Sequence, residues 1–431
     1  MFKEYDYDNK PIVDVVNEII VDAVGKGASD IHFDPTDKEL NVRIRIDGSL
    51  LDYSKVPETV KKNLVTRIKI ISGMNITESR LPQDGAIKGL IENNDVDLRV
   101  SSLPTVDGEK VVIRILDYRM SLNGLEAIGL TRDNYNIIND LIKKPSGIIM
   151  VTGATGSGKS TTVYSMLQVL NTTDRNIITV EDPVEMKITG INQVQVMSEI
   201  GLTFGHTLRS ILRQDPDVIM IGEIRDDETA RIAIRASITG HLVLSTIHTN
   251  NSLNTIERLL DMEVERYLLG TALSGIISQR LVKRLCPKCR SKRPTNDYEK
   301  RIFKAVLGID MNEIYQQVGC EECLDGYKGR VAIHEVLEIN QDIRDAIVGN
   351  VRKEELRALV YGKDANTLLK DGLIKIMEGF TSMDELLRVI DIEDDFGKGD
   401  EEIKNAIMGK PVETPTIESA ANDAIETIES L

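Results

Sequence analysis

The chain has 431 residues, of which 41% are hydrophobic and 28% charged. These fractions are typical of packed globular proteins and exclude a disordered, fibrous or mini-protein class, while at about 150 residues per domain the length predicts about three domains. The net charge of −16 disfavours bulk nucleic acid as a partner. No apolar run reaches the length of a membrane helix and residues 1–10 form no signal peptide, so we expect a cytoplasmic protein.

Residues 1–120 are predicted to form a mixed α/β domain of their own. An apolar stripe with helical spacing opens it, at Ile12, Val15, Val16, Ile19, Ile20 and Ala23. Apolar and polar residues then alternate in short runs, such as 41–47, 96–100 and 111–116, a pattern typical of half-buried strands. Asp-Gly pairs at 47–48, 84–85 and 107–108 are predicted turns between these strands.

Residues 121–285 have the pattern of a parallel α/β core. Short, wholly apolar runs alternate with amphipathic segments of helical length, and such runs are typical of buried parallel strands. The runs are 148–151, 177–180, 218–221 and 242–244. The prediction is a doubly wound α/β domain.

The remaining chain is predicted to fall into three parts. Residues 286–323 contain all four cysteines, and 324–390 are predicted to be a helical C-terminal subdomain because short helical patterns dominate from Ile343 onward. Residues 391–431 hold 12 acidic and three basic residues, more than half of the chain's net negative charge. We expect them to be a weakly ordered acidic tail.

A phosphate-binding loop, hereafter the phosphate loop, follows the first apolar run of the core. Residues 153–160 read GATGSGKS and match G-x-x-x-x-G-K-[ST] between a predicted strand and a predicted helix. Such glycines let backbone N–H groups converge on a phosphate, and the helix N-terminus attracts anions. In this pattern Lys159 contacts the β- and γ-phosphates and Ser160 ligates Mg²⁺. The predicted nucleotide-binding residues are Gly153, Ala154, Thr155, Gly156, Ser157, Gly158, Lys159, Ser160 and Thr161.

Two carboxylates are candidates for the chemistry of hydrolysis, which needs a group that holds the metal and a group that orients water. Glu223 follows the apolar run 218–221, and Glu181 follows 177–180. Ligands gather at the carboxyl ends of parallel strands, so both side chains are placed to face the phosphates. The alternative for each is a solvated charge at the end of a strand.

His241 and His248 lie at the two ends of another predicted strand. Side chains alternate along a strand, so residues seven positions apart point to opposite faces and cannot both meet one phosphate. His248, at the carboxyl end, is the candidate γ-phosphate sensor. For His241 a functional role and a structural role stay open, and His32 and His334 are predicted to be structural.

The four cysteines form two C-x-x-C pairs with 30 residues between them. They are Cys286 with Cys289 and Cys320 with Cys323. In a reducing compartment this pattern indicates a metal site, and four thiolates suit a closed tetrahedral zinc. The alternative is four free cysteines in a core.

Four segments of the core resemble the signature boxes of the secretion ATPases, the hexameric motors of type II secretion and type IV pilus assembly (the GspE/PilB family). The phosphate loop is similar to their Walker A box and 177–185 (IITVEDPVE) to their Asp box. Residues 208–226 (LRSILRQDPDVIMIGEIRD) resemble Walker B, and 239–250 (TGHLVLSTIHTN) the His box. The resemblance extends over residues 11–390.

The first domain is similar to the second N-terminal domain of this family, which is PAS-like. The matching segments are 28–32 (ASDIH), 43–48 (RIRIDG), 80–85 (RLPQDG) and 108–110 (GEK). The resemblance implies that Arg99 and Arg114 reach the phosphates, because they match family arginines that do so. An arginine among alternating apolar residues is compatible with an anion partner, and a surface salt bridge is the alternative.

The resemblance implies a RecA-like P-loop core and a Mg²⁺-dependent ATP hydrolase that assembles as a homo-hexamer at the inner face of the cytoplasmic membrane. Its expected partner is a polytopic platform protein (PilC/GspF-like), and its expected catalytic residues are Glu181, Glu223, Arg99, Arg114 and His248, with Ser160 and Glu223 on magnesium. The cysteines match the zinc site of assembly motors, which PilT-type retraction motors lack. This favours assembly, with a retraction or competence-pilus motor as the alternative.

Family members commonly carry a further domain before the point that corresponds to Pro11, and only ten residues precede it here. We therefore expect this chain to lack that domain, which is the usual docking piece for membrane-associated partners.

Three other classes are less favoured. An ABC-type ATPase needs its signature loop before the Walker B carboxylate, whereas Leu273-Ser274-Gly275 follows Glu223. A nucleic-acid motor could use residues 280–304, with ten basic and two acidic residues, but a solvated face around the cysteine site is the favoured explanation. Contact with anionic lipid headgroups or with an acidic loop of a membrane protein stays open. A non-hydrolysing scaffold would need only the phosphate loop, whereas this chain also has Glu181, Glu223, Arg99 and Arg114.

Overall fold

The computed structural model describes residues 2–7, 9–91, 94–116, 124–362 and 365–390, so the predicted acidic tail lies outside the described residues. The chain divides into two compact units, Met1–Leu122 with Lys328–Arg330, and Asn123–Tyr327 with Val331–Leu431. No helix in the described part of the chain is long and apolar enough to span a bilayer.

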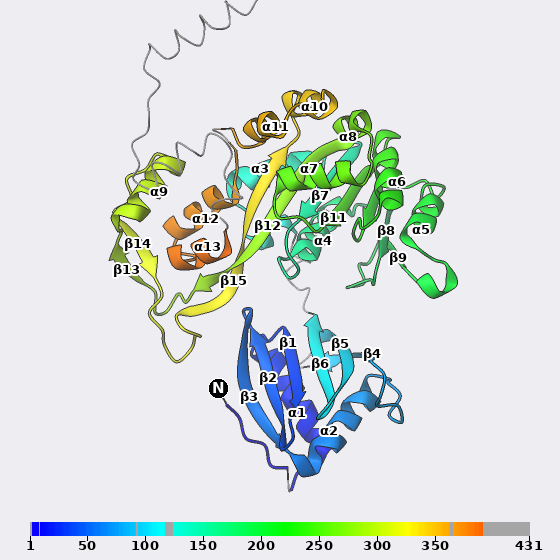
Figure 1. Cartoon of the computed structure of the whole chain (residues 1–431), viewed down its shortest axis with the longest axis vertical. Helices are drawn as coiled ribbons and strands as arrows, with labels where there is room; N and C mark the ends of the chain where they lie inside the picture. The colour runs from blue at the N-terminus through cyan, green and yellow to red at the C-terminus, as the bar shows by residue number, and fades with distance from the viewer. Residues whose placement is uncertain (1, 8, 92–93, 117–123, 363–364, 391–431) are drawn as a thin grey trace, which may run out of the picture. The chain divides into compact units, whose positions relative to one another are not determined.

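The first unit is a six-stranded antiparallel sheet with two helices, α1 and α2, packed on it (Figure 1). The strand order is β3-β2-β1-β6-β5-β4. The elements are α1 (Ile12–Gly25), β1 (Asp30–Pro35), β2 (Glu39–Ile46), β3 (Ser49–Pro57), α2 (Glu58–Ile71), β4 (Gln83–Ile91), β5 (Asn94–Thr105) and β6 (Gly108–Leu116). The predicted helical stripe is confirmed, because Val15, Val16, Ile19, Ile20 and Ala23 are all buried on α1.

One predicted turn of this unit is wrong. Asp84 and Gly85 lie inside β4, where they pair with Ser101 and Val100 of β5. A Cβ on Gly85 would come within 2.3 Å of the Ser72 carbonyl oxygen, at the end of α2. Gly85 therefore allows α2 and β4 to approach each other closely. In the sequence, an Asp-Gly pair of this kind looks the same as an Asp-Gly turn.

The second unit is built on a seven-stranded sheet, in the order β15-β12-β7-β11-β10-β8-β9. The predicted apolar runs form β7 (Gly147–Thr152), β8 (Ile177–Glu181), β10 (Val218–Ile221) and β11 (Leu242–Ile247), and these four strands are parallel neighbours. The other strands of this sheet are β9 (Asn192–Gln195), β12 (Leu273–Leu285) and β15 (Tyr327–Glu338). The predicted parallel α/β core is confirmed.

Helices connect these strands and cover the sheet. They are α3 (Arg132–Leu141), α4 (Lys159–Leu170), α5 (Phe204–Ile211), α6 (Asp227–Ile238), α7 (Ser252–Asp261), α8 (Arg266–Ala272), α10 (Gln341–Val348) and α11 (Lys353–Val360), with short 3-10 turns at η2 (Leu125–Ile128) and η3 (Ser198–Ile200). Ile148 and Met150 of β7 share one apolar core with Ala230 and Ile234 of α6. Alternate residues of β7 thus face α6, as side-chain alternation along a strand requires.

A second apolar core in this unit lies at the far ends of β12 and β15. It contains side chains of α9 (Asp297–Leu307), β14 (Glu313–Gln316), α12 (Leu368–Met377) and α13 (Met383–Val389), together with Val282 and Ile333. The short β13 (Ser291–Pro294) pairs with β14. Ile276, near the start of β12, and Ile339, directly after β15, belong to the first core. Figure 1 shows β12 and β15 running from one group of elements to the other.

The region 324–390 is therefore not wholly helical. Its first element, β15, is a 12-residue strand of the core sheet, and α10 and α11 pack against that core. The strand was hidden in the sequence because residues 332–336 are all buried but include the polar His334 and Glu335, so they form neither a wholly apolar run nor a regular apolar–polar alternation.

Candidate functional site

The phosphate loop connects β7 to α4 at the carboxyl end of the parallel sheet. Its tip, residues 154–156, is exposed, whereas Ser157 and Lys159 are buried. Lys159 Nζ donates hydrogen bonds to the carbonyl oxygens of Gly153 (2.8 Å) and Ala154 (3.1 Å). The ammonium group thus lies inside the curve of the loop, where a phosphate can replace the carbonyl oxygens as its partner.

The loop fits a nucleotide phosphate in two further respects. Helix α4 begins at Lys159 after Gly158, and no side chain among the described residues caps it, so its first N–H groups are available to an anion. Ser157 Oγ is buried and has no hydrogen-bond partner in the described part of the chain. A buried hydroxyl without a partner is costly, and a bound ligand is one way to satisfy it.

Glu223 and His248 lie together at the ends of β10 and β11. His248 Nε2 is 3.5 Å from one carboxylate oxygen of Glu223, and Arg225 donates to the other at 2.5 Å. Glu223 is mostly buried, with 16% of its side chain exposed. The two strands are parallel neighbours, so residues that follow them meet at one edge of the sheet.

Electrostatics connects this pair to the phosphate loop. Burial lowers the pKa of Lys159, and the nearby carboxylate of Glu223 acts in the opposite direction. Burial also lowers the pKa of His248, the charge of Lys159 lowers it further, and Glu223 opposes the change. His248 is therefore a neutral ring at neutral pH, able to donate or accept a hydrogen bond.

Glu181 ends β8 as predicted, but side chains engage both of its carboxylate oxygens. Thr179 and Gln193 donate to Oε1 at 2.5 and 3.1 Å, and the Tyr164 hydroxyl donates to Oε2. Glu181 is 2% exposed. To orient a water molecule, this carboxylate would have to exchange one of these hydrogen bonds.

His241 lies just before β11, away from the carboxyl ends of the strands. Its Nδ1 is 2.9 Å from the Ala236 carbonyl oxygen and 3.3 Å from Thr239 Oγ1. The geometry favours the structural alternative for this residue, because a backbone carbonyl already satisfies the ring.

Arg99 and Arg114 belong to the first unit, where they are direct cross-strand neighbours on β5 and β6. Arg114 Nε donates to Asp30 at 3.0 Å, and the Arg114 side chain is 61% exposed. Two like charges opposite each other destabilise an antiparallel pair unless an anion lies near both. The pairing of β5 with β6 is what brings the two predicted arginines together.

Two residues near the phosphate loop were missed by the sequence analysis. Arg225 pairs with Glu223 and lies 3.9 Å from Asp182, and its position two residues after Glu223 could have suggested this. Gln279 of β12 contacts the loop across 122 residues of chain, and no sequence signal indicates it.

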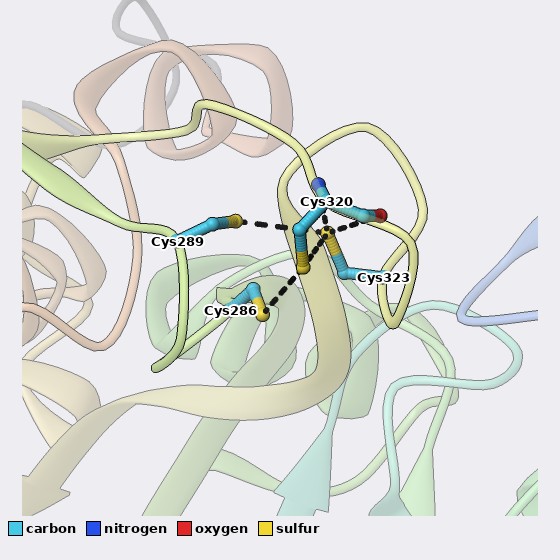
Figure 2. Close-up of side chains that lie close together, drawn as sticks. All are labelled: Cys286, Cys289, Cys320 and Cys323. Atoms are coloured by element: carbon cyan, nitrogen blue, oxygen red, sulfur yellow. Dashed lines mark hydrogen bonds between the residues drawn. The ribbon is translucent and has the colours of Figure 1, made fainter.

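The four cysteines converge between β12 and β13 on one side and β14 and β15 on the other (Figure 2). All four Sγ atoms lie within 4.8 Å of one another, and three Sγ pairs are separated by 3.5 to 3.9 Å. Four sulfurs at about 2.3 Å from a tetrahedral zinc are about 3.8 Å apart. The cluster is consistent with zinc binding.

These features define a P-loop ATPase with a parallel α/β core. A family model described as "Type II/IV secretion system protein" matches residues 6–388. The type II secretion system protein E of Aeromonas hydrophila is 45% identical over 89% of this chain and 76% of its own length. The type IV pilus assembly ATPase PilB of Acinetobacter baylyi is 44% identical over 89% of this chain and 67% of its own length.

Solved structures agree on the fold. The pilus retraction motor PilT with bound ADP is 28% identical, with a TM-score of 0.59, over 86% of this chain and 96% of its own. The Legionella pneumophila ATPase DotB, 23% identical over 88% of this chain and 96% of its own, superposes with a TM-score of 0.65. The chain belongs to the GspE/PilB family and is an ATP hydrolase of type II secretion or type IV pilus assembly.

Proposed function

We propose that this ATPase works as a ring of six chains that drives pilin subunits out of the membrane, into a type IV pilus or a secretion pseudopilus. The observation that carries the proposal is the convergence of the phosphate loop, Glu223 and His248 at one edge of the sheet. A hydrolysis site of this kind supplies energy for movement when it couples to domain closure. The family is typically oligomeric, and six is the number that the resemblance implies.

The residues of the second unit have distinct roles in this proposal. Lys159 and residues 153–161 hold the phosphates, and Ser160 and Glu223 are the groups placed to hold Mg²⁺. The metal, when bound, neutralises phosphate charge and polarises the transferred phosphoryl group. His248, neutral and 3.5 Å from Glu223, donates a hydrogen bond to the γ-phosphate or to the carboxylate, and so reports which nucleotide is bound.

Three further roles follow the family resemblance. Glu181 orients the attacking water after exchanging one of its present hydrogen bonds, and Arg99 and Arg114 stabilise the charge that develops on the phosphates. Steady-state hydrolysis by Glu181→Gln, Arg99→Ala and Arg114→Ala checks these roles. Each variant should lose kcat by at least about tenfold, and any variant with unchanged kcat and KM has no place in the mechanism.

The tetracysteine cluster is proposed to hold one structural zinc ion through Cys286, Cys289, Cys320 and Cys323. The proposed working place is the inner face of the cytoplasmic membrane, where the ring acts on a polytopic platform protein. Metal analysis of the purified protein tests the first point, since one zinc per chain is expected. Co-purification with the platform protein tests the second.

The experiment that tests the function measures sheared surface pilin from cells that carry Lys159→Ala. At equal expression of the parent and the variant, surface filaments should disappear while pilin accumulates in the membrane, because the variant loses phosphate binding. Lys143→Ala is the matched control, since Lys143 is an exposed lysine of the same unit that pairs only weakly with Asp140 at 3.8 Å.

The other outcomes are equally informative. An increase of surface filaments would identify a retraction motor and overturn assembly. Unchanged filaments, together with loss of exported proteins from the medium, would move the function to the secretion pseudopilus. No change in either would overturn the proposal.

A further inference from the structure

Gln279 lies in the middle of β12 and is 1% exposed. Its Nε2 donates to the Ser157 carbonyl oxygen at 2.7 Å, and its Oε1 accepts a hydrogen bond from the Thr162 hydroxyl at 2.7 Å. A single side-chain amide therefore joins the phosphate loop to the first turn of α4. The bond to Ser157 crosses 122 residues of sequence.

The loop is shaped to accommodate Gln279 at both of its ends. A Cβ on Gly153 would lie 2.4 Å from the Gln279 carbonyl oxygen, and a Cβ on Gly158 would lie 3.1 Å from Nε2. Both glycines also have positive φ, 147° and 92°. These two motif glycines thus permit the approach of β12 as well as the backbone conformation of the loop.

The hydrogen bond to Ser157 fixes the direction of one peptide group. In a trans peptide the carbonyl of Ser157 and the N–H of Gly158 point in opposite directions. With the carbonyl bound to Gln279, the Gly158 N–H points away from β12. Backbone N–H groups are what a phosphate loop uses to bind anions, so the orientation of this peptide affects affinity directly.

The chemistry requires an amide at this position. Gln279 supplies one donor to a carbonyl and one acceptor to a hydroxyl, and a buried site leaves no water to replace either. A glutamate has the same shape but, when ionised, cannot donate to the Ser157 carbonyl. A leucine fills similar space but satisfies neither group.

We propose that Gln279 is a positioning residue for ATP hydrolysis, which holds the Ser157–Gly158 peptide and the start of α4 in the phosphate-binding orientation. The inference rests on the proposed role of the phosphate loop as the ATP site. Gln279 does not touch the reacting atoms and acts only through Ser157 and Thr162. Its effect is therefore on nucleotide affinity rather than on the chemical step alone.

Steady-state ATP hydrolysis and melting temperatures of the full chain, with and without Mg-ADP, test this role. Gln279→Glu should raise KM for ATP at least about tenfold and lose most of the Mg-ADP-induced rise in melting temperature, measured against the melting temperature of the same variant without nucleotide. Gln168→Glu is the charge-matched control, because Gln168 lies on α4, the helix that Gln279 contacts, but is only partly buried. It should keep the parent KM.

Variants of Thr162 isolate the second hydrogen bond and keep the test valid if Gln279→Glu does not fold. Thr162→Val should raise KM, and Thr162→Ser, which retains the hydroxyl, should restore it. Combining Thr162→Val with Gln279→Leu should raise KM less than the product of the single effects, since the two residues share one bond.

Three results would overturn the proposal: an unchanged KM in Gln279→Glu, an equal rise in Gln168→Glu, or a KM in Thr162→Ser as poor as in Thr162→Val. Lys159→Ala separates this failure from failure of the site itself. If Lys159→Ala still shows the full Mg-ADP stabilisation, the phosphate loop is not the nucleotide site. If Lys159→Ala loses the Mg-ADP stabilisation while Gln279→Glu keeps it, only the proposed role of Gln279 is wrong.

Discussion

At the scale of single residues, Glu223 has the most distinctive surroundings in the candidate site. Its two oxygens face Arg225 and His248, and its charge influences Lys159. Arg225 already supplies a counter-charge, and burial keeps His248 neutral. One oxygen of the carboxylate thus accepts a hydrogen bond from a cation, while the other lies beside a neutral ring.

Glu223→Gln should keep nucleotide binding while hydrolysis falls at least about tenfold. The amide retains the shape of the side chain but removes the negative charge that the proposed role in magnesium binding needs. Turnover and the binding of a fluorescent ATP analogue are measured on the same preparation. Glu257→Gln, on a surface carboxylate that pairs with Lys353, should leave both unchanged. Full turnover in Glu223→Gln would remove Glu223 from the mechanism.

His334 is a residue whose charge state affects stability rather than catalysis. It lies on β15 with no exposed surface, and both ring nitrogens lack a hydrogen-bond partner among the described residues. Burial, with the charge of Lys375 acting in the same direction, lowers the pKa of His334 to about 3. Nearby Asp371 and the adjacent Glu335 are also buried, and burial raises the pKa of each carboxyl group.

The contribution of His334 to the free energy of unfolding should therefore decrease as the pH is lowered. The unfolded chain takes up a proton below the ordinary histidine pKa of 6.5, whereas the folded chain does not until about pH 3. Between pH 7 and pH 5 this linkage removes about 2 kcal/mol. In urea unfolding, the free energy of unfolding of His334→Leu should fall less between pH 7 and pH 5 than that of the parent, by about 2 kcal/mol. Equal losses would show that the folded state accommodates a charged His334.

At the scale of elements, β12 connects features that are distant in the sequence. Ser278 donates at 3.2 Å to the carbonyl oxygen of Asn250, the last residue of the segment that resembles the His box. Gln279 contacts the phosphate loop, and Cys286 follows directly after the strand. The backbone N–H of Cys286 also donates to Gly326, beside the second cysteine pair. One strand thus reaches both the phosphate loop and the cysteine cluster.

Removal of the proposed zinc by a chelator should loosen residues 286–323 before the parallel core melts. The cluster joins the two loops that precede β13 and β15, while β12 and β14 are held by the second apolar core through Val282 and Ile314. Hydrogen exchange resolves the two regions, and protection should fall first around Cys289 and Cys320. Loss of protection everywhere at once would show that cluster and core form one cooperative unit.

At the scale of the whole molecule, the chain consists of two units with separate apolar cores, each able to exclude water from its own sheet. Interfaces between domains of one chain usually allow relative motion. A motor that converts hydrolysis into closure needs such an arrangement, and a ring couples the movement of one chain to that of the next.

Mixing parent chains with Lys159→Ala chains tests the ring. If one inactive chain stops a ring of six, an equal mixture retains about 2% of the parent ATPase activity, because only fully parental rings work. Independent chains would retain about half. The activity is measured across the full range of mixing ratios, and a linear decline would contradict coupled action.

Several parts of the fold and site could be predicted from the sequence because their signals are local. The glycines and lysine of the phosphate loop, the apolar runs of β7 and β10, and the stripe of α1 each depend on neighbours a few residues away. The paired cysteines are also a local signal, since the spacing alone indicates a metal site. Glu223 and His248 followed from the rule that ligands gather at the carboxyl ends of parallel strands.

Other features were decided only by tertiary structure, because they depend on groups brought together across long stretches of chain. Gly85 is close to Ser72 instead of forming a turn, and β15 joins the core sheet although its sequence precedes a helical region. Two of the side chains that donate to Glu181 come from other elements, α4 and β9. The contact of Gln279 with the phosphate loop exists because β12 lies beside β7, and the pairing of these strands is a property of the folded sheet rather than of any segment.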